Sequence, residues 1–166
     1  MKIEFRKNIP LLLQGDIRMT ELGVAKGDFS HQLLQHENVL LTMVDRWGGD
    51  RGHGDSEMNY ASRQTEFAKD RRFIVKKTFE DAVIDYEDEY FDIVYIDGYA
   101  HTGQDGGKTL ELWYSKVRSG GVFSGHDYHK AWQPTIDAVD AFARKHNLEF
   151  NITEKDEFPS WYIIKP

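Results

Sequence analysis

The sequence lacks cysteine altogether, and this absence excludes several kinds of site. A chain without thiols has no disulfide framework, no thiolate zinc centre, no iron–sulfur cluster and no cysteine nucleophile. Proline is scarce as well, with 4 residues in 166, and 14 glycines are typical neither of a fibrous nor of a disordered protein. We therefore expect a globular core without covalent cross-links, which is compatible with a reducing cytoplasm.

Long apolar runs are also missing. Near the N-terminus the stretch Ile9–Leu13 is followed directly by Gln14 and Gly15. A secretory signal needs an apolar stretch of about 7–15 residues, and a membrane helix needs about 20. No run in the sequence approaches the second length, so we expect a soluble, cytoplasmic protein with no membrane partner.

Basic residues are also fewer than acidic ones. The sequence has 21 Lys and Arg residues and 28 Asp and Glu residues, so the net charge is −7 with histidine neutral. Binding to nucleic-acid phosphates needs clustered Lys and Arg, so we expect no nucleic-acid partner. The chain does have 40% hydrophobic residues in a length typical of one domain. We expect residues 1–166 to form a single domain, with residues 1–17 as an N-terminal helix or extension.

The apolar positions fall into short runs separated by segments with helical spacing. The runs cover residues 18–24, 39–45, 73–76, 91–97 and 120–127. Nearly uninterrupted apolar strands that alternate with helices are typical of a parallel sheet covered on both faces. The sequence therefore predicts a doubly wound, Rossmann-like α/β fold, a three-layer α/β/α sandwich.

The intervening segments and the end of the chain complete this pattern. Apolar side chains recur at helical intervals from Phe29, from about residue 57, from Phe79, from Leu110 to Val117 and from Trp132 to Phe142. Residues 148–153 and 160–165 form two further apolar runs, joined by a charged turn that contains proline. Because no helix separates them, they predict an antiparallel hairpin at the edge of the sheet.

Polar residues follow each of the five earlier runs. They are Glu21-Leu22-Gly23, Asp45, Lys77-Thr78, Asp97-Gly98 and His126-Asp127. In open α/β sheets ligands bind outside the carboxyl ends of the strands, where the strand order reverses. Acids at four of these five ends indicate a ligand site along one edge of the sheet.

The first of these ends has the features of a ligand-binding turn. Gly23 and Gly27 allow a tight strand-to-helix turn and close approach of a ligand to the backbone. They do not make the G-x-G-x-x-G pattern of a dinucleotide site, and the carboxylate of Glu21 favours a cationic ligand over a phosphate. Asp45 follows Gly23 by 22 residues, close to the spacing of about 20 at which an acid binds ribose hydroxyls.

Four segments together carry a resemblance to a known family. ELGVAKGDFS, MVDRW, FDIVYIDG and GGVFSGHDY closely resemble class I S-adenosylmethionine-dependent methyltransferases. The most similar branch includes the sugar O-methyltransferases of macrolide and aminocoumarin biosynthesis. The resemblance covers the chain from about residue 15 to its end, in the same order and spacing. It implies a seven-stranded, mostly parallel sheet whose last strand is antiparallel.

The resemblance also implies a role for each strand-end residue toward S-adenosylmethionine. Glu21, Gly23 and Gly27 would contact the methionine part of this cofactor. Asp45 would bind the ribose hydroxyls, and Asp97 would lie near the methyl-transfer centre.

The same resemblance implies which residues surround the base. Arg46 and Trp47 would lie beside the adenosine. Thr78 and Phe79, directly after the third predicted strand, would flank the adenine.

A metal ion is a further expectation at this edge. Asp97 and Asp127 follow adjacent strands and offer two hard oxygen ligands for one Mg²⁺, which would polarise an acceptor hydroxyl. In metal-dependent relatives the second acid is usually followed by Asn or Asp. Here Tyr128 follows Asp127, so the third ligand is missing or comes from elsewhere. The sequence therefore does not decide whether the site binds Mg²⁺.

His101 and His126 are the candidate general bases, because an imidazole with a pKa near 6.5 accepts a proton at neutral pH. His101 follows Asp97 by four residues, whereas the family more often has three, so a surface or structural role stays open for it. For His126 the alternative is a side chain that only lines the site.

The leading hypothesis is a methyltransferase that acts on a hydroxyl of a small molecule or a glycan. Two other readings stay open: a binding or regulatory protein that keeps the cofactor pocket without turnover, and a nicotinamide-dependent oxidoreductase on the related fold. The absent G-x-G-x-x-G pattern counts against the second. A homo-oligomer in which a second copy completes the pocket is also compatible with the sequence.

Overall fold

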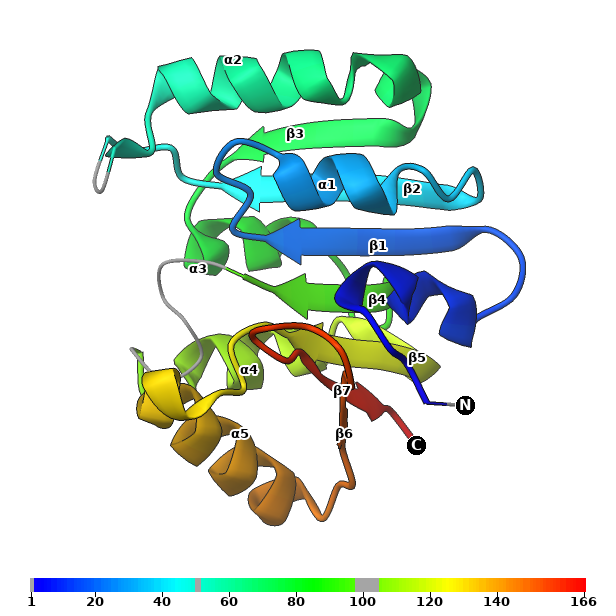
Figure 1. Cartoon of the computed structure of the whole chain (residues 1–166), viewed down its shortest axis with the longest axis vertical. Coiled ribbons are helices and arrows are strands. Elements are labelled where there is room, and N and C mark those ends of the chain that lie inside the picture. The colour runs from blue at the N-terminus through cyan, green and yellow to red at the C-terminus, as the bar shows by residue number, and fades with distance from the viewer. Residues whose placement is uncertain (1, 50–51, 98–104) are drawn as a thin grey trace.

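A computed structural model describes residues 2–49, 52–97 and 105–166, and they build one seven-stranded sheet (Figure 1). The strands are β1 (Ile17–Leu22), β2 (Val39–Asp45), β3 (Arg72–Lys76), β4 (Phe91–Ile96), β5 (Val117–Gly125), β6 (Asn151–Ile152) and β7 (Trp161–Ile164). Their order in the sheet is β3-β2-β1-β4-β5-β7-β6. β1 to β5 are parallel, whereas β7 is antiparallel to both β5 and β6. The predicted mostly parallel sheet with an antiparallel terminal hairpin is confirmed.

Helices cover both faces of the sheet, as the alternating pattern predicted. One face carries η1 (Arg6–Leu12), α1 (Asp28–Leu33), α2 (Asp55–Gln64) and η3 (Glu66–Arg71). The other carries α3 (Phe79–Ala82), η4 (Val83–Asp85), α4 (Lys108–Tyr114), η5 (Lys130–Trp132) and α5 (Gln133–His146). Each face buries its own apolar cluster, so the fold is the three-layer sandwich that the sequence predicts.

Strand periodicity decides which face each side chain joins. In β4, Ile93 and Tyr95 pack in the cluster under η1 and α1, whereas Val94 packs in the opposite cluster. Because side chains alternate along a strand, Asp97 points to the same face as Tyr95. The same argument places Glu21 on that face. The two acids at the ends of neighbouring strands therefore face the N-terminal segment.

Several element boundaries differ from the expectation; β1, for example, ends at Leu22 and β5 ends at Gly125. Val117 does not continue the helix with Trp113, because it begins β5 opposite Phe91 and is buried in the core. The strand predicted over 120–127 therefore starts three residues earlier. In the terminal hairpin only the short β6 and β7 pair, since Leu148 and Phe150 pack against the core from outside the sheet.

The predicted N-terminal extension forms η1, a seven-residue 3-10 helix that contains Pro10 and buries Ile9. Helices within the described ranges do not combine the length and hydropathy needed to cross a bilayer.

Candidate active site

The carboxyl ends of β1 and β4 define a crevice. From β1 the chain continues to β2 on one side, while β4 and β5 extend the sheet on the other, so the strand order reverses between β1 and β4. Such a switch point is where open α/β sheets bind their ligands. Asp97 N donates to Leu22 O over 2.7 Å, and His126 N donates to Ile96 O over 2.9 Å. The predicted strand-end residues of β1, β4 and β5 therefore meet at one edge.

Glu21 is the most deeply buried acid of this crevice, with 1% of its surface exposed. Its Oε2 accepts a hydrogen bond from the hydroxyl of Ser30 on α1. Burial raises the pKa of Glu21 to about 8; the Ser30 bond and Arg6 oppose this, while Asp97 adds to it. Because a buried carboxylate is costly without a cation, this position favours a positively charged ligand group.

The two predicted glycines are explained by the backbone that follows β1. Gly23 and Gly27 have φ of 97° and 80°, in the left-handed region that favours glycine. Gly27 caps α1, and a Cβ there would lie 2.9 Å from Ala61 Cβ on α2. The turn and the packing of α1 on α2 therefore require these glycines, and their contact with a cofactor stays a prediction.

Asp45 fixes the two loops that follow β1 and β2 at the carboxyl edge of the sheet. Its Oδ2 accepts hydrogen bonds from the backbone N–H groups of Val24 (2.9 Å) and Ala25 (3.0 Å), and its Oδ1 accepts one from Trp47 N (2.9 Å). A carboxylate has about four lone-pair sites, so three such bonds leave acceptor capacity for ribose hydroxyls. Sequence spacing predicts a ligand role for Asp45, which stays a prediction, and it did not reveal this structural role.

The residues expected around the base have local roles in the structure. Trp47 is buried, and its Nε1 donates to Ala25 O over 3.0 Å, so the indole supports the loop after β1. Thr78 caps α3 by accepting from Asp81 N over 3.1 Å. Phe79 packs partly buried against the cluster on the opposite face. Their contacts with adenosine stay predictions.

Arg46 follows Asp45 at the end of β2 and is exposed. His101 lies outside the residues that the structure describes.

Asp97, His126 and Asp127 form a connected cluster at the ends of β4 and β5. His126 Nδ1 lies 2.9 Å from Asp127 Oδ1 and 3.3 Å from Asp97 Oδ1. Burial lowers the pKa of His126, but the bonds to Asp127 and Asp97 outweigh it and raise the pKa to about 9. The sequence-based expectation was a pKa near 6.5. With the higher value the imidazole is protonated at neutral pH, so it accepts a proton only after losing this one.

The same cluster fits a divalent cation. One ligand atom from each of Asp97, His126 and Asp127 lies within 4.8 Å of the others. If a cation binds there, His126 would supply the third donor that the sequence did not find next to Asp127. Two carboxylate oxygens and an imidazole nitrogen suit Mn²⁺ or similar ions as well as Mg²⁺, and only a neutral imidazole can ligate.

Arg6 is the site residue that sequence reasoning missed. From η1 its Nη1 donates to Asp97 Oδ2 over 2.8 Å, and its guanidinium lies 4.3 Å from the ring centroid of Phe29. Burial lowers the pKa of Arg6, but its interactions with Tyr95, Asp97 and Glu21 outweigh burial and raise the pKa above its ordinary value, so Arg6 is a permanent cation. No local pattern marks it, because its partner is 91 positions away in the sequence.

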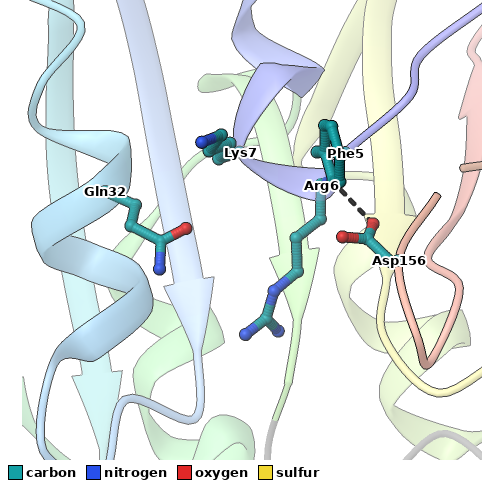
Figure 2. A pocket seen from close by; sticks show the side chains of 5 residues that line it. All are labelled: Phe5, Arg6, Lys7, Gln32 and Asp156. Carbon is teal, nitrogen blue, oxygen red and sulfur yellow. Dashed lines mark hydrogen bonds between the residues drawn. The ribbon is translucent and has the colours of Figure 1, made fainter.

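A pocket of about 240 Å³ opens beside this residue (Figure 2). It is lined by Phe5, Arg6, Lys7, Gln32 and Asp156. Figure 2 shows the Arg6 side chain pointing away from Asp156, between β1 and β4. Arg6 therefore links the pocket at its backbone end to the crevice at its guanidinium.

The raised pKa values predict how stability depends on pH. A group whose pKa rises on folding stabilises the protein below its unfolded pKa, and this contribution is lost as pH rises through the folded pKa. For Glu21 the window runs from 4.5 to about 8, and for His126 from 6.5 to about 9. We expect the free energy of unfolding in urea to fall across pH 5–9, by about 4 kcal/mol for Glu21 and about 3 kcal/mol for His126.

Glu21→Gln and His126→Gln should each flatten this fall, whereas His146→Gln on α5 should leave it unchanged. A free energy of unfolding that rises with pH over the same range would contradict the assignment.

Solved structures share this architecture. An O-methyltransferase from Bacillus cereus in complex with SAH matches with a TM-score of 0.67 at 15% identity, covering 96% of this chain and 80% of that one. A precorrin-6y C5,15-methyltransferase from Geobacter metallireducens gives 0.68 at 16% identity, covering 93% and 82%. A spermidine synthase from Thermotoga maritima gives 0.67 at 16% identity; the match covers 98% of this chain but 58% of that one. At these identities the likeness shows the fold alone.

The strand order and the solved neighbours define the fold class: a Rossmann-like, three-layer α/β/α domain. A family described as "Methyltransferase domain" matches residues 20–128, well over half of the sequence, and the chain belongs to this family. No curated protein matches the chain. The family match includes Glu21, Asp97 and Asp127 but begins after Arg6.

Proposed function

We propose that the protein is an S-adenosylmethionine-dependent O-methyltransferase that acts on a hydroxyl of a small molecule or a sugar. The observation that carries this proposal is the meeting of Glu21 with the Asp97–His126–Asp127 cluster at one switch point, in a member of a methyltransferase family. A buried acid there suits a cationic cofactor, and the cluster suits an acceptor that must lose a proton.

The site residues have two proposed roles: some bind the cofactor, and others act on the proton of the acceptor hydroxyl. Glu21 would face the ammonium of the cofactor's methionine part, and Asp45 would add ribose hydroxyls to its backbone donors. S-adenosylmethionine supplies a methyl group on a sulfonium, whose carbon–sulfur bond breaks as the carbon–oxygen bond to the acceptor forms. The protein's main task is then to align the acceptor oxygen with that methyl group.

The Asp97–His126–Asp127 cluster would promote loss of the proton from the acceptor hydroxyl. Asp97 is held from two sides, by Arg6 and by His126, so its carboxylate has a fixed direction. A neutral His126 could accept the acceptor's proton directly. When a divalent cation occupies Asp97, His126 and Asp127, it would lower the pKa of the hydroxyl instead.

A methyl-transfer assay tests the proposal. Labelled S-adenosylmethionine would be offered with catechols, other phenols and sugars, and the label followed into the acceptor. We expect transfer to at least one hydroxylated acceptor. A protein that binds the cofactor and stays inactive across the panel would favour the binding or regulatory alternative.

The cation cluster gives a separate prediction. Treatment with EDTA is expected to lower the rate at least about tenfold, and Mg²⁺ or Mn²⁺ should restore it. Asp127→Asn should weaken Mn²⁺ binding in calorimetry by about 10- to 100-fold, whereas Asp137→Asn on α5 should not change it. Full activity in EDTA would show that the proton is handled by side chains alone.

A further inference from the structure

The N-terminal segment is fixed across the crevice from two directions. Ile3 and Ile9 are buried in the core under α1. Glu154 N donates to Ile3 O over 3.1 Å, and Arg6 N donates to Asp156 Oδ2 over 2.8 Å. The segment is thereby tied to the connection between β6 and β7. These contacts therefore fix the backbone position of Arg6 beside the crevice.

The guanidinium of Arg6 lies where a cofactor's methionine end is expected. It stacks on Phe29, the residue before Ser30, whose hydroxyl is bonded to Glu21. It is paired with Asp97 through Nη1 and lies between β1 and β4 in Figure 2. The crevice thus contains a buried acid and a half-buried arginine close together.

This pair of charges matches the chemistry of an α-amino acid. The methionine part of S-adenosylmethionine carries a carboxylate and an ammonium group. The strand-end acids account for the ammonium, but they offer nothing to the carboxylate. Arginine has five N–H donors in a fork that fits carboxylates. Arg6 pairs with Asp97 through one nitrogen, Nη1, and makes a side-chain hydrogen bond with Tyr95, so these two contacts do not use all of its donors.

We infer that Arg6 binds the carboxylate of the cofactor's methionine part while Glu21 faces its ammonium, so that the N-terminal segment completes the cofactor site. This inference rests on the proposed function, since it takes S-adenosylmethionine as the ligand. It adds a binding residue from outside the segment that the family match covers. The contrary reading is that Arg6 competes with the ammonium of the amino-acid end for the acids, in which case removing the charge of Arg6 would strengthen binding of S-adenosylhomocysteine.

Two ligands separate these readings in calorimetry. S-adenosylhomocysteine has the amino-acid end but no sulfonium, and 5′-deoxy-5′-methylthioadenosine has neither the carboxylate nor the ammonium. For Arg6→Gln we expect the Kd of S-adenosylhomocysteine to rise about 10- to 100-fold, with less than about threefold change for methylthioadenosine. Arg6→Lys should recover part of the loss. Lys7→Gln, whose side chain points elsewhere in Figure 2, should change neither Kd.

The outcomes are distinct. Selective loss for S-adenosylhomocysteine supports the inference. An equal loss for both ligands would assign Arg6 a structural role, and tighter binding would show competition; both would overturn the inference and leave the proposed function intact. A wild-type protein that binds neither ligand would overturn both.

Discussion

Asp97→Asn is expected to lower kcat for methyl transfer by about 100- to 1,000-fold. Asparagine keeps the shape of the side chain but removes the charge that faces Arg6 and His126. It also removes one of the two carboxylates from the candidate cation cluster. Because the cofactor contacts that we propose for Glu21 and Asp45 do not involve Asp97, the Kd for S-adenosylhomocysteine should change by less than about threefold. Initial rates at saturating cofactor and calorimetry measure the two effects.

The matched control is Asp92→Asn on the same strand. Asp92 lies at the amino end of β4, where it accepts from Arg18 N and pairs with Arg118. Its replacement should leave kcat unchanged. If Asp97→Asn kept wild-type activity, or if both variants lost it equally, the site would not lie at the carboxyl end of β4.

Asp45→Ala is expected to weaken binding of S-adenosylhomocysteine by at least about 100-fold. Three backbone N–H groups lose their acceptor, so the loops after β1 and β2 lose their fixed positions, and an acceptor for the ribose hydroxyls disappears as well. The free energy of unfolding should fall by about 2 kcal/mol for the same reason. Calorimetry and urea unfolding measure the two changes.

This variant should also differ from Arg6→Gln in its ligand profile. The affinity for methylthioadenosine should fall along with that for S-adenosylhomocysteine, because the ribose is common to both. The control is Asp55→Ala. Asp55 lies on α2, where it is an exposed partner of Lys76, and the variant should bind S-adenosylhomocysteine and methylthioadenosine with normal affinity. Unchanged affinity in Asp45→Ala would contradict the assignment of Asp45 to the ribose hydroxyls.

The sheet could be predicted from the sequence because strands that are buried on both faces consist of nearly continuous apolar residues. FDIVYID and VLLTMVD are nearly continuous apolar runs, and such runs form the central strands β4 and β2. Asp97 and Asp45 at the ends of these runs lie at the same edge of the sheet because parallel strands end there. That these strand-end residues gather at one edge was therefore predictable from the sequence, while their binding of a cofactor or a metal stays a prediction.

The features that the sequence did not predict depend on contacts between distant residues. Val117 shares the helical spacing of Trp113, and only its pairing with Phe91 makes it a strand residue. The hydrogen bonds of Asp45 to Val24 and Ala25 span 21 and 20 positions, and the pair of Arg6 with Asp97 spans 91. No periodicity over a short window carries such information, so the structural role of Asp45 and the position of Arg6 emerged only from the fold.

A calorimetric titration of the wild-type protein with S-adenosylhomocysteine tests the central claim most directly. We predict saturable binding at one site per chain, and no heat when NAD⁺ is titrated in its place. Heat with NAD⁺ and none with S-adenosylhomocysteine would contradict the claim that the acids between β1 and β4 hold a sulfur nucleoside.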